Sequence, residues 1–119
     1  MLGSKAHLVA RYLDLLSLQQ RVTATNVANV DTPGYRTKGI DFAAAMRAVL
    51  DDPSGGSTVG LPHVQEVDGL PVKNDGNDVI LERELETISE TAIRFSHALL
   101  MLRGSIRSVR NAIHEGRLQ

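Results

Sequence analysis

Residues 78–115 read DVILERELETISETAIRFSHALLMLRGSIRSVRNAIHE, and this stretch decides the fold. Its apolar residues recur at alternating spacings of four and three, the heptad repeat of a helix that packs along one side. This predicted helix-packing seam consists of Leu81, Leu85, Ile88, Ala92, Phe95, Leu99, Leu102, Ile106, Val109 and Ile113. Asp78 is placed to cap the helix, and the glutamates near its start and arginines near its end suit the helix macrodipole. The pattern predicts a long C-terminal helix over residues 79–115.

The N-terminal residues predict a second long helix, with Ser4 as its N-cap and Asn29 in its last turn. Its apolar residues fall on two stripes. The first stripe consists of Leu8, Tyr12, Leu15 and Val22, and the second of Val9, Leu13, Leu16 and Val27. Because both terminal segments carry apolar stripes at helical spacing, we expect the two ends of the chain to pair.

The fold that we expect is all-α, with the two long helices paired as an antiparallel coiled-coil hairpin. Such a hairpin places Val22 near Ile88, Leu15 near Phe95 and Leu8 near Leu102, with Arg21 within reach of Glu86 or Glu90. One buried seam leaves little margin over the entropy of ordering the backbone. Ile93 and Leu100 lie off the seam and would face water, which is typical of an interface. We therefore expect helices that need neighbouring subunits; the simpler alternative is a bundle closed by residues 42–50.

Between the long helices the sequence predicts a turn, a short helix and a loop. Pro33 and Gly34 fit the central positions of a type II turn. Asp41 looks like the cap of a short helix with Phe42, Met46, Val49 and Leu50 on one face. Glycines and prolines punctuate the middle loop, in which residues 63–67 could form a strand. The expected division is an N-terminal helix at 1–30 with a motif running to 36, a turn and short helix at 31–50, a flexible middle loop at 51–78 and a C-terminal helix at 79–115.

The composition argues against several functional classes. The chain has 119 residues and a formal net charge of −1, so nothing indicates a nucleic-acid-binding surface. It has no cysteine, which excludes disulfides, thiol catalysis and cysteine-ligated metals. Its histidines, His7, His63, His97 and His114, lack the spacing of a metal site. No run reaches the roughly 20 apolar residues of a membrane span, and the N-terminus lacks the pattern of a cleavable signal peptide. We expect no enzymatic activity, cofactor, metal or small-molecule substrate.

The stretch NVANVDTPGYR at residues 26–36 carries the most specific signal for function. It resembles the signature of the flagellar basal-body rod family, in which Asn, Ala and Asn precede Thr-Pro-Gly-Tyr and a basic residue. The matching positions are Asn26, Ala28, Asn29, Thr32, Pro33, Gly34 and Tyr35. Residues 39–42 and 76–84 also look like the proximal-rod member of that family, and the short middle segment agrees with it.

The same motif has a physical interpretation. The side-chain amides of Asn26 and Asn29 can satisfy free carbonyls of the last helical turn or bond to a neighbouring chain. Both possibilities stay open at this point. We expect Tyr35 to pack its ring against the helix with its hydroxyl at the surface.

The resemblance implies a structural subunit of the proximal rod that supports flagellum assembly and motility. Its terminal helices would self-assemble in the inner layer of a rod that crosses the periplasm and transmits torque. Export would use the flagellar type III apparatus without a cleaved signal. The implied partners are copies of itself, other rod proteins, the ring–rod junction protein and the export apparatus, with no nucleic acid, membrane insertion or small molecule. The rival hypothesis is a cytoplasmic coiled-coil adaptor or regulator, which explains the heptads but not residues 26–36.

Overall fold

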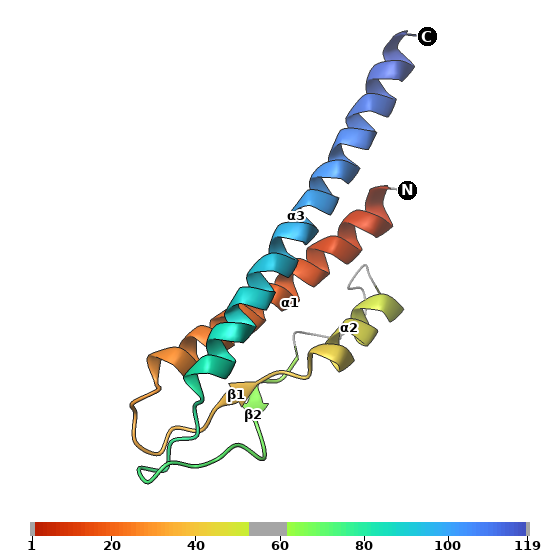
Figure 1. Ribbon diagram of the computed structural model, residues 1–119. Helices are drawn as coiled ribbons and strands as arrows, with labels where there is room; N and C mark the ends of the chain where they lie inside the picture. The colour runs from red at the N-terminus through yellow and green to blue at the C-terminus, as the bar shows by residue number, and fades with distance from the viewer. Residues whose placement is uncertain (1, 53–61, 119) are drawn as a thin grey trace.

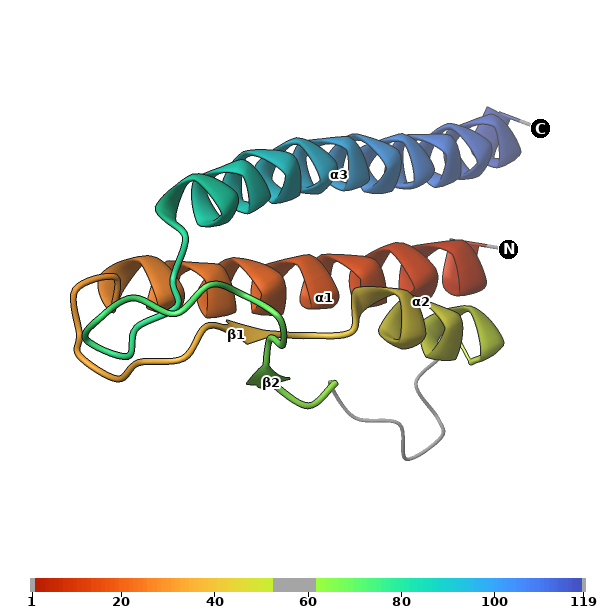
Figure 2. The same ribbon diagram turned by 60° about the horizontal axis from the view of Figure 1, so that its bottom comes forward.

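The computed structural model describes residues 2–52 and 62–118 of the chain. It is mostly helical, with two long helices, α1 (Leu2–Ala28) and α3 (Leu81–Leu118), that lie side by side and run in opposite directions (Figure 1). The short helix α2 (Phe42–Asp51) packs on α1, which lies between α2 and α3 (Figure 2). The molecule is elongated, at 72 × 28 × 16 Å. No helix within the described residues is both long and apolar enough to cross a membrane.

The contact between α1 and α3 centres on a small apolar cluster. Val9 and Leu16 of α1 and Ala98 of α3 are its buried members. Half-buried side chains pack around them, namely Tyr12, Leu13, Phe42, Phe95 and Leu102. Val9, Leu13 and Leu16 belong to the second predicted stripe of α1, and Phe95 and Leu102 belong to the predicted seam, so the two ends of the chain do pack on each other. The cluster also takes Tyr12 from the first stripe, Phe42 from α2 and Ala98 from outside the seam.

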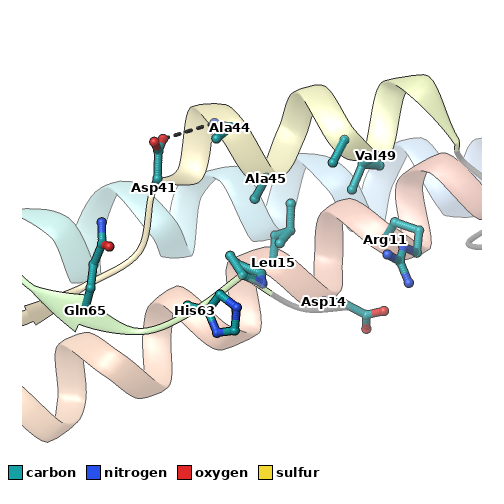
Figure 3. Close-up of a pocket in the computed structure, with 11 residues that line it drawn as sticks. Arg11, Asp14, Leu15, Asp41, Ala44, Ala45, Val49, His63 and Gln65 are labelled. Carbon is teal, nitrogen blue, oxygen red and sulfur yellow. Dashed lines mark hydrogen bonds between the residues drawn. The ribbon is translucent and has the colours of Figure 1, made fainter. Parts of the chain in front are cut away.

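The alignment of the two helices agrees with the predicted one, but the face of α1 differs. The alignment that pairs Val22 with Ile88 also sets Asn26 opposite Glu84, and these two side chains are hydrogen-bonded at 3.0 Å. Leu15, however, lines a hollow beside α2 (Figure 3) and does not belong to the cluster around Ala98. The first stripe was therefore the wrong choice for the contact with α3, because its central leucine is used to bury α2.

The inner face of α3 also differs from the predicted seam. Its buried positions are Glu84, Thr91, Ala98 and Ser105, which recur every seven residues and are small or polar. The seam residues flank this line. Ile88, Phe95, Leu99, Leu102 and Val109 are half-buried, whereas Leu81, Leu85, Ala92, Ile106 and Ile113 are exposed. The expectation that one hairpin buries the whole seam is wrong, because small side chains at the closest approach place the larger ones on the flanks of the helix pair.

The helix ends follow the sequence signals in part. Asp41 caps α2 as predicted, since its Oδ1 accepts a hydrogen bond from Ala44 N at 3.0 Å. The helix ends at Asp51, where the sequence predicted a stop. Ser4 does not begin α1, which starts at Leu2, and Asp78 does not begin α3, which starts at Leu81.

Part of the predicted middle loop has a defined path. Strand β2 (Gln65–Glu66) pairs antiparallel with β1 (Lys38–Gly39), and Val67 N donates to Thr37 O at 2.9 Å. The strand expected within residues 63–67 is therefore present, but its partner comes from before α2. Residues 53–61 of the predicted loop lie outside the described residues.

Candidate functional site

The sequence motif lies at the end of the molecule where the last turn of α1 and the first turn of α3 come together. The segment after α1 and the segment that enters α3 run beside each other there (Figures 1 and 2). Gly34 N donates to Asp75 O at 2.9 Å, and Asp78 N donates to Tyr35 O at 3.3 Å. We call the polar cluster between these segments the polar joint; it consists of Asn26, Tyr35, Thr37, Asn77, Asp78 and Glu84.

Asn26 is the centre of the polar joint. Its side chain is 1% exposed, and it uses every hydrogen-bonding position of its amide. The Nδ2 group donates to Lys38 O at 2.8 Å and to Glu84 Oε2 at 3.0 Å. The Oδ1 atom accepts from Tyr35 Oη and from Lys38 N, both at 2.9 Å. Asn26 therefore has no polar capacity left for a neighbouring chain, and its role is to join three segments of its own chain.

Tyr35 points its hydroxyl inward, which corrects the expectation that this group lies at the surface. The hydroxyl donates to Asn26 Oδ1 at 2.9 Å. Burial raises the pKa of Tyr35, and the negative charges of Glu84 and Asp78 raise it further. The phenol consequently stays protonated, as a hydrogen-bond donor must.

Glu84 is a charged member of the joint next to Asn26, and Arg83 pairs with it from outside the joint. Glu84 is 1% exposed, although it lies on a helix whose other early glutamates face solvent. Its Oε2 accepts from Asn26, and its Oε1 pairs with the guanidinium of Arg83. A buried carboxylate is stable only with such partners. Glu84 thus fixes the start of α3 against the end of α1.

Asp78 holds the strand-forming segment instead of capping α3. Its Oδ1 accepts from both the backbone N and the Oγ1 of Thr37, the latter at 2.8 Å. Burial alone would raise the pKa of Asp78, but the two Thr37 hydrogen bonds and the charge of Arg36, whose Nε lies 3.4 Å from Oδ2, lower it overall. Asp78 is therefore a charged group under ordinary conditions, and the capping prediction for it is wrong.

Asn77 closes the end of α1. It is fully buried, and its Nδ2 donates to Asn29 O and to Thr32 O, both at 2.8 Å. Its Oδ1 accepts from Val79 N at 2.8 Å. The last carbonyls of a helix lack partners within the helix. Asn77 supplies one from 48 residues away and so ties the two helix ends together.

The turn of the motif brings two glycines into backbone contact. Tyr35 N donates to Thr32 O at 3.2 Å and Gly34 has a φ of +75°, as a type II turn requires. Gly76 has a φ of +86°, and a Cβ added to it would lie 3.3 Å from Gly34 Cα. Gly34 favours glycine through its positive φ alone, since a Cβ there would meet open space, whereas Gly76 combines a positive φ with the close approach of the other segment.

The structure places two of the predicted motif residues, Asn26 and Tyr35, in the polar joint and adds residues that the sequence analysis did not name as site residues. Asn29 donates from Nδ2 to Thr25 O and accepts at Oδ1 from Thr32 Oγ1, while Ala28 and Pro33 are exposed. The missed members are Thr37, Asn77 and Glu84. Glu84 had a signal, since a glutamate seven residues before Thr91 and fourteen before Ala98 continues a line of side chains on one face of the helix.

Comparison with known proteins identifies the family of the chain. Residues 13–36 match the family model described as "Flagella basal body rod protein". The flagellar basal body rod protein FlgB of Borrelia hermsii is 33% identical over 108 residues, covering 75% of this chain and 80% of that protein. The protein of the same name from Escherichia coli K12 is 26% identical over 122 residues, covering 87% of this chain and 88% of that protein.

An elongated helical chain whose buried polar side chains join its own segments is typical of a structural protein. The chain belongs to the flagellar basal-body rod protein family. It is a structural subunit of the bacterial flagellum and not an enzyme, as its relatives are rod proteins. The family model ends at Arg36, so of the polar joint it covers Asn26 and Tyr35.

Proposed function

We propose that this rod subunit belongs to the proximal rod and that its two terminal helices form a coiled-coil unit that self-assembles and transmits torque. The observation that carries the proposal is the polar joint. Torque passes through a subunit only if its elements keep their relative positions. The joint supplies that rigidity, because Asn26 alone bonds to Lys38, Tyr35 and Glu84.

The exposed apolar side chains of α3 support assembly with neighbouring helices. Leu81, Leu85, Ile106 and Ile113, from the predicted seam, are each more than 40% exposed. Large exposed apolar surface on a protein usually marks an interaction site. We therefore keep the seam, including its unburied members, as a proposed packing surface between subunits.

The partners and the location follow from the family in the same way. We propose that the subunit contacts copies of itself and other rod proteins, with the ring–rod junction protein and the export apparatus as further partners. Its proposed place is the periplasmic part of the basal body, which it reaches by type III export without a cleaved signal. In the division that we propose, the terminal helical regions at 1–30 and 79–115 make the rod wall. The expectation of a flexible segment over 51–78 does not hold for its last residues, because Asn77 and Asp78 are buried in the polar joint.

The rival hypothesis of a cytoplasmic adaptor or regulator is not favoured. Such a protein would need the paired helices, but it would have no need of the rod motif at residues 26–36. The relatives that match most of the chain are all named as rod proteins.

A deletion strain complemented with the wild-type chain tests the proposal. We expect the deletion strain to lack filaments by electron microscopy and to be non-swimming, and we expect the wild-type chain to restore both. Basal bodies isolated from the complemented strain should contain the chain. Normal filaments and swimming in the deletion strain, without a second copy of the gene, would contradict the proposal.

A further inference from the structure

One side of α3 is left uncovered by the rest of the chain. α1 lies between α3 and α2, so no described element covers the side of α3 that faces away from α1 (Figures 1 and 2). Ile93 and Leu100 project there and are 59% and 62% exposed. They are seven residues apart, about two helical turns, and Glu86 lies seven residues before Ile93 on the same line. We call Glu86, Ile93 and Leu100 the ridge.

A groove runs between α1 and α3 on a different side of α3. It has a volume of about 480 Å³, and most of its surface is apolar. Its residues include Ser17, Gln20 and Arg21 of α1 and Ala92, Phe95 and Ser96 of α3. Successive residues on a helix are about 100° apart, so Ala92 and Ile93 point to different sides. The small side chains of Ser17, Ala92 and Ser96 leave room for another helix to approach.

The groove and the ridge each carry a polar group that has no partner among the residues that the structure describes. Gln20 Oε1 is buried in the groove without a hydrogen bond, which is unusual for a buried polar atom. Among the described residues, Arg21 at the groove and Glu86 on the ridge form no ion pair. Arg21 was expected to lie within reach of Glu86 or Glu90 of the same chain. The opposite charges of Arg21 and Glu86 are instead available to a contact between chains.

We infer that the ridge of a second copy of this chain docks in the groove, with its α3 parallel to the α3 that lines the groove. This inference rests on the proposed function and specifies the surfaces that it uses. Because α1 and α3 are antiparallel, the end of the groove at Arg21 of α1 lies beside Thr91 of α3, and the end at Ser17 lies towards Ser96. Only a parallel ridge puts Glu86 at the Arg21 end while Ile93 enters the apolar part.

The contact is heterologous, since ridge and groove are different surfaces of one chain. Each copy that fills the groove of a neighbour still presents its own groove to a third copy. Such contacts generate closed rings or open helical assemblies instead of isolated dimers. The arrangement is what the wall of a tube requires.

Cysteine cross-linking in assembled rods tests the inference, and the chain offers a clean background because it has no native cysteine. The double variant Ser17→Cys/Ile93→Cys is expressed in the deletion strain, and basal bodies are isolated, oxidised and run without reducing agent. We expect a ladder of dimers, trimers and larger species of this chain. Each single variant should give no ladder, because each then lacks one half of the contact.

The control pairs the ridge cysteine with a cysteine elsewhere, as Ala43→Cys/Ile93→Cys, since Ala43 is exposed on α2. It should give no ladder. A dimer from Ile93→Cys alone would show ridge-to-ridge contact and overturn the inference. So would basal bodies that contain the double variant but yield no chain-to-chain product. Filaments counted in the same cells report on the proposed function separately, because rods that assemble without this contact leave that function standing.

A charge exchange tests the register of the contact. Added to the double-cysteine chain, Arg21→Glu should lower the ladder yield about tenfold, and Arg21→Glu/Glu86→Arg should restore it to within about twofold of the starting chain. Arg47→Glu makes the same charge change at an exposed arginine of α2 and should leave the yield unchanged. A yield that falls with Arg21→Glu but is not restored by Glu86→Arg would overturn the proposed pairing.

Discussion

The polar joint and the outer side of α3 differ in whether their side chains have partners within the chain. At the joint, buried polar groups such as Asn26 and Asn77 find all their partners within the chain. Along the outer side of α3, large apolar groups such as Ile93 and Leu100 find none. A single folded chain is therefore complete at one end and incomplete along one side. Substitutions at the joint should act on the stability of the chain itself, and substitutions on the outer side should act on assembly.

The largest effect on stability is expected at the centre of the joint. Asn26→Leu removes four hydrogen bonds and leaves Glu84, Tyr35 and the backbone of Lys38 with unsatisfied buried groups, which should cost about 3–5 kcal/mol of unfolding free energy. Urea unfolding followed by circular dichroism measures it. Asn29→Ala, at a half-buried amide of the same motif, should cost only about 1 kcal/mol. Equal losses for the two variants would mean that the joint is not centred on Asn26.

The backbone contact at the joint should have the next largest effect. Gly76→Ala forces a positive φ on alanine and sets its Cβ 3.3 Å from Gly34 Cα. We expect a loss of about 2–3 kcal/mol in the same unfolding experiment. Gly69→Ala is the matched control, because Gly69 has a φ of +81° but open space around it, and it should cost about 1–2 kcal/mol. A loss no greater than that of the control would argue against the close approach of the two segments.

Acid should weaken the joint through Asp78. Its pKa is lowered in the folded chain from an ordinary value of 3.8, so its contribution to stability is present above that value and is lost as the pH falls through the lower folded pKa. Asp78→Asn keeps the shape but removes the titration, and it should cost about 1–2 kcal/mol at pH 7. The difference in unfolding free energy between the two chains should shrink below pH 3.8. A difference that is constant with pH would show that Asp78 is not the titrating group.

The smallest effect on chain stability is expected on the outer side of α3. Leu100→Ser should change the unfolding free energy by less than about 0.5 kcal/mol, because this side chain is already 62% exposed. It should nevertheless reduce the number of filaments in the complemented deletion strain. Leu50→Ser, at a leucine of α2 that is 58% exposed, should leave both quantities unchanged. Normal filament numbers with Leu100→Ser would contradict the division of labour between the two regions.

The sequence predicted the long helices and their alignment because apolar periodicity and chain direction determine both. It did not predict which face of α3 packs against α1. The buried positions on that face include Glu84, Thr91 and Ser105, which are not apolar, so the apolar pattern does not identify them. The polar joint was hidden for a related reason. The partners of Asn26 and Asn77 come from distant parts of the chain, and a single sequence with no structure does not show which distant segments meet.

The motif was recognised, but the hydrogen-bond partners of its side chains were predicted only in part. Pro33 and Gly34 act in the turn as predicted. The hydroxyl of Tyr35 was expected at the surface, whereas the amide of Asn26 was left open between the carbonyls of the helix end and a neighbouring chain. In the structure these two groups are bonded to each other inside the chain. Helix-end signals are local, whereas the bonds that use these side chains are not.

The separation of the joint's partners along the chain also affects when the joint can form. Asn26 and Glu84 are 58 residues apart, and Thr37 and Asp78 are 41 apart. Contacts between distant residues form late, because the entropy of closing the intervening loop must be overcome first. When only α1 has been synthesised, Asn26 has no partner and the native fold cannot be completed. Premature folding is thereby delayed until the C-terminal half of the molecule is present, a property that suits a subunit proposed to travel unfolded to its place of assembly.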